Sequence, residues 1–69
     1  METAKLKVEG MSCEGCVASV TRVLEAVPGV SQVSVTLRPG AATIAYDAAR
    51  TSVPMLKAAI EEAGYDAAA

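Results

Sequence analysis

The chain has 69 residues, of which 52% are hydrophobic, and its net charge at pH 7 is −2. This length fits a single domain, which we assign to residues 1–69. The weak charge, with acidic and basic residues interspersed, argues against nucleic acid as a partner, because nucleic-acid binding calls for a basic face. The chain has no apolar run near the ~20 residues of a membrane span, and its first residues lack the pattern of a signal peptide. We therefore expect a cytoplasmic protein that does not insert into a membrane.

The first half of the chain changes from a strand period to a helical period. Residues 4–9 alternate apolar and charged side chains, which predicts a half-buried strand. Residues 14–27 then follow a helical period, and Pro28 and Gly29 are expected to end that helix. Its apolar side chains fall within an arc of roughly 120°, and they are Cys16, Val17, Val20, Val23, Leu24 and Val27.

A hairpin is predicted next. Residues 30–37 alternate again, and residues 42–46 return as the antiparallel partner strand. The intervening Arg38-Pro39-Gly40-Ala41 has the composition of a tight turn, because proline presets φ at the second position. We expect Gly40, at the third position, to adopt a positive φ.

The remaining residues predict a second helix and a short last strand. Thr51 or Ser52 caps the helix, and Gly64 ends it. Met55 lies at the margin of the apolar side of this helix, where we expect ordinary packing. Residues 65–68 are poor in β-branched side chains, so they predict a weak strand at a sheet edge.

The resulting order, βαββαβ, indicates the fold class. Each helix is apolar on one side only, and each strand is half polar. Both sets of apolar side chains are buried when two helices pack on one face of a four-stranded antiparallel sheet. With right-handed crossovers, this arrangement is the α+β ferredoxin-like sandwich.

The chain's two cysteines lie three positions apart in Met11-Ser12-Cys13-Glu14-Gly15-Cys16, where a loop leads into the first helix. Free N–H groups and the positive dipole end at a helix N-terminus favour the thiolate, which is the form that binds metal. Soft sulfur ligands select Cu(I) among the abundant ions. A structural zinc site requires four ligands, whereas this chain has no histidine. The pair is therefore predicted to bind one Cu(I) ion per chain.

The two cysteines should differ in exposure. Cys16 lies at the edge of the apolar arc of its helix, whereas Cys13 precedes the helix and should be exposed. An exposed ligand beside a half-buried one suits metal transfer, because an incoming thiolate can attack from the open side. On this hypothesis, iodoacetamide should not label Cys16 faster than Cys13.

Several motifs together resemble those of heavy-metal-associated domains. The segment from Gly10 to Cys16 resembles the GMxCxxC signature of that family, and the similarity extends over essentially the whole chain. The other matching motifs are Pro28-Gly29-Val30, Tyr46-Asp47 and Gly64-Tyr65-Asp66. Within the family, the chain is most similar to the small cytosolic copper chaperones of bacteria.

This resemblance implies roles for four residues and a kind of partner. Cys13 and Cys16 would bind Cu(I), Met11 would support the loop rather than bind the metal, and Tyr65 would lie close to the metal. A tyrosine at this last position is typical of soluble bacterial chaperones. The partner would be the metal-binding domain of a copper-transporting P-type ATPase or a copper-responsive regulator, which would receive the ion by exchange of ligands.

Other functions stay open at this point. The chain has no histidine and no recognisable catalytic constellation, so we do not expect an enzyme. A mercury-binding protein, or a metal-binding domain of a copper ATPase, would carry the same motif and fold. A small thiol oxidoreductase would also use a cysteine pair, and it would catalyse the reduction of insulin disulfides. A homodimer in which metal bridges two cysteine pairs is also left open by the sequence.

Overall fold

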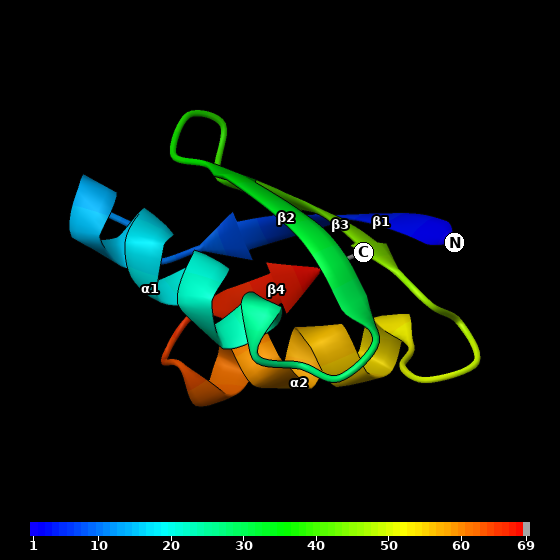
Figure 1. Ribbon diagram of the computed structural model, residues 1–69. Helices are drawn as coiled ribbons and strands as arrows, with labels where there is room; N and C mark the ends of the chain where they lie inside the picture. Colours follow the sequence, from blue (N-terminus) through cyan, green and yellow to red (C-terminus); the bar gives the residue numbers. More distant parts are fainter. Residues whose placement is uncertain (69) are drawn as a thin grey trace.

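Residues 1–68 of the computed structural model are described, and their elements follow the predicted order βαββαβ. These are β1 (Glu2–Glu9), α1 (Glu14–Glu25), β2 (Val30–Thr36), β3 (Ala41–Tyr46), α2 (Val53–Glu62) and β4 (Asp66–Ala68). The strands form one antiparallel sheet in the order β2-β3-β1-β4. Both helices cover the same face of this sheet (Figure 1). The predicted ferredoxin-like fold is confirmed.

The core lies between the inner face of the sheet and the facing sides of both helices. Alternate residues of β1 and β3 point into it, and their register places Leu6 opposite Ala42 and Ala4 opposite Ile44. Each helix contributes apolar side chains four residues apart to the core, because residues at this spacing lie on the same side of a helix. The buried hydrophobic side chains are Ala4, Leu6, Val8, Val20, Leu24, Ala42, Ile44, Tyr46, Leu56, Ile60 and Ala67.

Helix α1 ends earlier than its apolar pattern predicts. It stops at Glu25, because Val27 precedes Pro28 and a residue before proline is disfavoured in the helical region. The Val27 amide donates to the Leu24 carbonyl at 3.1 Å, which tightens the last turn. Gly29 then takes a φ of +95°, as expected for a glycine that follows a helix, and the chain turns into β2.

The turn between β2 and β3 differs from the expected one. The Arg38–Pro39 peptide bond is cis, and Gly40 is not among the glycines with positive φ, so that expectation is wrong. Glycine is needed at position 40 for another reason: a Cβ there would collide with the Val8 carbonyl oxygen. The Gly40 carbonyl accepts a hydrogen bond from the Val8 amide at 3.0 Å. The hairpin is therefore fixed against the end of β1 that leads to the cysteine loop.

Helix α2 begins and ends near the predicted residues. Ser52 is the N-cap residue, with an extended backbone, and Gly64 follows the helix with a φ of +98°. Met55 was expected to pack, but its side chain is 55% exposed, so that expectation is wrong. It borders an open apolar groove between α1 and α2. Neither helix among the described residues is long and apolar enough to cross a membrane.

Thr51 buries a hydroxyl just before α2, and this hydroxyl has no hydrogen-bond partner among residues 1–68. An unpaired buried polar group is destabilising, whereas an apolar group of the same shape is not. We therefore expect Thr51→Val to raise the free energy of unfolding by about 1 kcal/mol. Urea denaturation measures this difference. A midpoint lower than that of the wild-type protein would contradict the unpaired state of the hydroxyl.

Candidate metal site

The two cysteine sulfurs face each other where β1 passes into α1. Cys13 is the N-cap residue of α1, and its backbone is extended (φ −157°, ψ 170°). Its carbonyl accepts hydrogen bonds from the amides of Cys16 at 3.0 Å and Val17 at 3.4 Å. Cys16 therefore lies in the first helical turn, and the two Sγ atoms are 3.5 Å apart. The extended N-cap residue and the first helical turn bring the pair together.

The geometry of the pair fits one soft ion. Both cysteines are free thiols, and their sulfurs are farther apart than the ~2.05 Å of a disulfide. Two thiolates on one metal, each at about 2.3 Å as for zinc, lie roughly 3.8 to 4.6 Å apart. A small side-chain rotation is enough to reach that spacing. Among residues 1–68, no group of three or more His, Cys, Asp or Glu side chains could bind a metal.

Tyr65 contributes most to lowering the pKa of the Cys16 thiol. The Tyr65 side chain, a backbone hydrogen bond at Ser12 and the side chain of Cys13 together lower the pKa of the Cys16 thiol from 9.0 to about 6. The same contact with Cys16 raises the pKa of the Tyr65 phenol. At pH 7 Cys16 is therefore largely a thiolate, which is the form that binds soft metals.

The predicted difference in exposure is present, but its expected chemical consequence needs revision. Cys13 is exposed and Cys16 is half-buried. Iodoacetamide reacts with the thiolate rather than with the thiol. Because the pKa of Cys16 is lowered, we now expect rapid labelling of Cys16 at pH 7, so the order of labelling does not test which sulfur is more accessible.

Removing the Tyr65 hydroxyl should shift the ionisation of Cys16. In Tyr65→Phe the pKa of the thiol should rise from about 6 toward 9.0. In the wild-type protein, the pKa of Cys16 is lower in the folded state than the ordinary value of 9.0 that applies to the unfolded chain. The Cys16 thiolate therefore stabilises the folded state above pH 9.0, and this stabilisation is lost as the pH falls through about 6. The pH dependence of the alkylation rate, with labelled peptides assigned by mass spectrometry, measures the shift. Tyr46→Phe is the control, because Tyr46 lies opposite Glu2 at the far end of β1. An unchanged pH profile for Tyr65→Phe would contradict the assigned cause.

Met11 and Tyr65 flank the loop from two sides. Met11 is half-buried against the core, and its Cε lies 3.6 Å from the position that a Cβ at Gly40 would take. Tyr65 lies beside Gly10, where a Cβ would stand 3.5 Å from the tyrosine Cδ1. Tyr65 reaches the loop because β4, which follows it directly, pairs with the end of β1. The structure thus brings the two cysteine sulfurs together, and it places Tyr65 beside the start of the loop and Met11 beside the hairpin.

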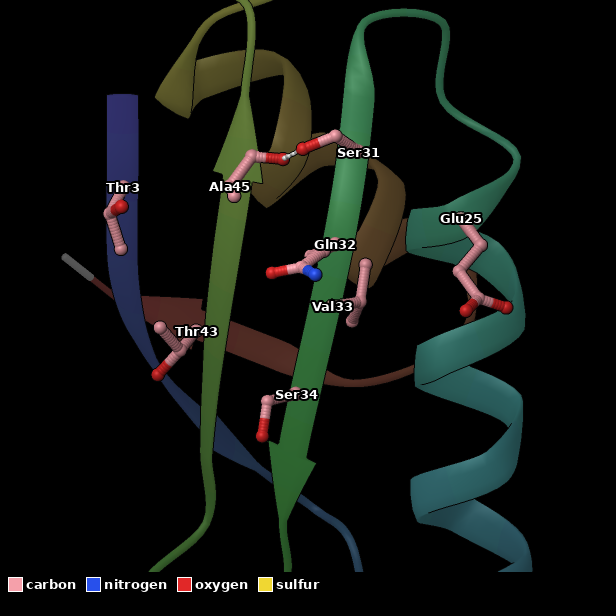
Figure 2. Close-up of a pocket in the computed structure, with 8 residues that line it drawn as sticks. All are labelled: Thr3, Glu25, Ser31, Gln32, Val33, Ser34, Thr43 and Ala45. Atoms are coloured by element: carbon pink, nitrogen blue, oxygen red, sulfur yellow. Dashed lines mark hydrogen bonds between the residues drawn. The ribbon is translucent and has the colours of Figure 1, made fainter. Parts of the chain in front are cut away.

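One hollow of the surface lies away from the cysteine loop. It has a volume of about 410 Å³ and runs along β2, at the end of α1 away from the cysteines (Figure 2). Its lining combines polar side chains with two apolar ones and a single carboxylate, and it consists of Thr3, Glu25, Ser31, Gln32, Val33, Ser34, Thr43 and Ala45. Figure 2 shows the Ser31 hydroxyl bonded to the Ala45 carbonyl, at 3.2 Å. These side chains offer no soft ligand, so we assign the site to the cysteine loop.

Comparison with known proteins agrees with this fold and this loop. Residues 5–66 match the model of the heavy-metal-associated domain. The chain belongs to this family. It is 44% identical over 68 residues to the copper chaperone CopZ of Bacillus subtilis, and the match covers 99% of each chain. It is 42% identical to the periplasmic component of the mercuric transport protein of Serratia marcescens, over 93% of this chain and 70% of that protein.

Solved structures of heavy-metal-associated domains superpose closely on this chain. The copper-binding domain of HMA7, a P-type ATPase, has a TM-score of 0.97 at 34% identity, with 99% of this chain and 92% of that domain covered. The present chain therefore shares its fold with copper chaperones, with a mercuric transport component and with ATPase domains. Its relationship to CopZ, a metallochaperone, agrees with the prediction that the chain is not an enzyme.

Proposed function

We propose that this chain is a single-domain Cu(I) chaperone that carries one ion on Cys13 and Cys16. The observation that carries the proposal is the pair of soft sulfur ligands 3.5 Å apart at a helix N-terminus. Two thiolates leave a Cu(I) complex with one net negative charge, which the amides of the first helical turn and the dipole favour. The 44% identity to the copper chaperone CopZ supports Cu(I) over other soft ions.

Transfer proceeds by exchange of thiolates. An incoming partner thiolate binds the ion from the open side next to exposed Cys13, so that three sulfurs share the metal. Cys13 then leaves and a second partner thiolate takes its place, and Cys16 leaves last because it is half-buried and less open to the partner than the exposed Cys13. The number of metal–sulfur bonds is restored at the end, and no electron is transferred. Met11 packs half-buried against the core near Gly40, and its role is to support the loop.

The partner in this proposal is the metal-binding domain of a copper-transporting P-type ATPase, or a copper-responsive regulator. Relatives of this chain include a copper-transporting ATPase of Rhizobium meliloti, at 39% identity over 64 residues. Domains of one fold can present matching cysteine loops to each other, which makes the shared intermediate geometrically simple. We propose a cytoplasmic location, because a reducing compartment keeps both thiols free.

A second candidate is Hg(II) binding, which the similarity to a mercuric transport component favours. That relative is a periplasmic protein by name, so this candidate would place the cysteine pair in an oxidising compartment. The two candidates differ in what the loaded protein delivers its ion to. Transfer to a copper ATPase domain supports the first, and transfer to a mercuric transporter supports the second.

The deciding experiment is an anaerobic titration of the reduced protein with Cu(I) in competition with a chromophoric Cu(I) chelator. We expect the protein to withdraw one ion per chain, and we expect protein alkylated at Cys13 and Cys16 to withdraw none. The Cu(I)-loaded protein should then pass its ion to the isolated metal-binding domain of a copper ATPase. Failure to compete with the chelator would overturn the copper proposal. Catalysis of insulin reduction would indicate a thiol oxidoreductase instead.

A further inference from the structure

Strand β2 is an edge strand of the sheet and carries no charged side chain. In the part of the chain that the structure describes, the strand order β2-β3-β1-β4 leaves β2 with a neighbouring strand on one side only. Its seven residues are all valine, serine, glutamine or threonine. An edge strand presents unpaired N–H and C=O groups, and proteins usually protect such an edge with charged side chains or proline. The edge of β2 has neither.

The regular part of this edge is symmetric about one serine. The register shift between β2 and β3 lies before Gln32, so residues 32–36 pair regularly with β3, and Ser34 is at their centre. Two antiparallel copies of this segment aligned on Ser34 place Val33 of each copy opposite Val35 of the other. Directly opposite residues have their side chains on the same face of a sheet. These half-buried valines therefore meet on the helix side, and the exposed polar residues meet on the open side.

Charges of opposite sign lie at the two ends of β2. Glu25, at the end of α1, lines the hollow together with Ser31, Gln32 and Val33 at the start of the strand. Figure 2 shows its side chain beside β2, on the side away from β3. Arg38 is exposed just after the end of the strand. A strand extends by ~3.3 Å per residue, so about 20 Å separates these two charges within one chain.

We propose that the edge of β2 is a docking surface for a second copy of this chain, whose β2 adds to it in the antiparallel direction across a two-fold axis at Ser34. A two-fold contact is self-complementary, because the same surface serves both copies. Antiparallel pairing brings the end of one β2 to the start of the other, and so brings Arg38 of each copy to Glu25 of the other. Backbone hydrogen bonds provide the affinity, and the two charge pairs fix the register.

The two cysteine loops stay apart in this arrangement. Each loop follows the end of β1, where the Val8 amide donates to the Gly40 carbonyl of the hairpin that follows β2. Antiparallel pairing places the two hairpins, and with them the two loops, at opposite ends of the joined sheet. The contact therefore needs no metal, in contrast to a dimer in which metal bridges two cysteine pairs. It also leaves both pairs open to a partner.

Sedimentation velocity of the reduced protein with a metal chelator present, over a concentration series that reaches the millimolar range, tests the proposal. We expect the wild-type protein to pass from monomer to dimer. Ser34→Lys places two like charges opposite each other at the axis, so it should abolish the dimer. Thr3→Lys is the matched control, because it adds the same charge to β1, which β3 separates from β2. It should leave the equilibrium unchanged.

Reversal of the two charges tests the register. Glu25→Lys and Arg38→Glu should each raise the dissociation constant about tenfold, because each replaces two attractive surface contacts by repulsive ones. The double variant, with both substitutions, should recover the wild-type constant. Since the two charges are too far apart to meet within one chain, such a recovery reports a contact between copies.

A wild-type protein that stays monomeric at every concentration overturns the proposal, and so does a dimer that Ser34→Lys leaves intact. Circular dichroism shows whether Ser34→Lys is folded, and the charge reversals carry the test if it is not. A double variant that stays as weak as the single ones rules out this register. Dimerisation that requires added Cu(I) would place the contact at the cysteine pairs instead.

Discussion

Replacing either Cys13 or Cys16 by serine should abolish tight Cu(I) binding. The two sulfurs are 3.5 Å apart, and residues 1–68 offer no third ligand of the kinds that complete a metal site. A hydroxyl is a hard, neutral ligand that suits Cu(I) poorly, so one thiolate would remain to compete with cellular thiols. We expect the affinity to fall by more than ~100-fold, the loss that even outer-shell changes can cause. Competition with the chromophoric chelator in the presence of glutathione measures this loss.

Met11→Leu is the matched control for the cysteine variants. Leucine keeps the volume of methionine and removes the sulfur, and Met11 packs half-buried against the core beside the hairpin. Because we assign Met11 to support, Met11→Leu should retain one Cu(I) per chain. Near wild-type affinity in Cys13→Ser or Cys16→Ser would contradict the two-ligand site. Loss of the ion in Met11→Leu would make Met11 a ligand.

Truncation of Leu24 to alanine should lower the free energy of unfolding by roughly 2–5 kcal/mol. Leu24 is fully buried on the side of α1 that faces the sheet, so its removal leaves a cavity in the core. A domain of this size has a total stability of only about 5 kcal/mol or a little more. Each kcal/mol lost lowers the Tm by ~4–8 °C in a small domain, so calorimetry should show a decrease of at least ~8 °C.

Met55→Ala provides the comparison for Leu24→Ala. The Met55 side chain is 55% exposed on α2, and substitutions at such positions usually change stability by less than about 0.5 kcal/mol. The two variants differ in burial but replace a long apolar helical side chain in the same way. An unchanged Tm for Leu24→Ala would mean that α1 packs through another face.

Periodicity was sufficient to predict the fold, because each element exposes one polar side and buries one apolar side. The alternation in β1 and the helical spacing of Val20 and Leu24 predicted which residues are buried. Periodicity could not predict why the turn needs a glycine at position 40. Its glycine is required by the Val8 carbonyl, a contact across the sheet that no local pattern encodes. Exposure of Met55 also depends on how widely the two helices separate, which the sequence does not specify.

The site could be predicted only in part from local sequence. Cys13 and Cys16 are close in sequence, so the helix start alone determines their separation. The position of Tyr65 came from resemblance to the family, since its approach to Cys16 depends on the pairing of β4 with β1.

The short length of β4 has a consequence for the dynamics of the site. Among residues 1–68, three residue pairs join this strand to β1, from Lys7 opposite Ala68 to Glu9 opposite Asp66, and Tyr65 directly precedes the strand. Segments with few hydrogen bonds open locally at a much lower free energy than the whole domain. Opening of β4 should therefore free the chain that follows Tyr65, while the Tyr65 amide stays bonded to the Ile60 carbonyl of α2 at 3.3 Å. The edge of the sheet beside the cysteine loop should exchange its amide protons sooner than the central strands do.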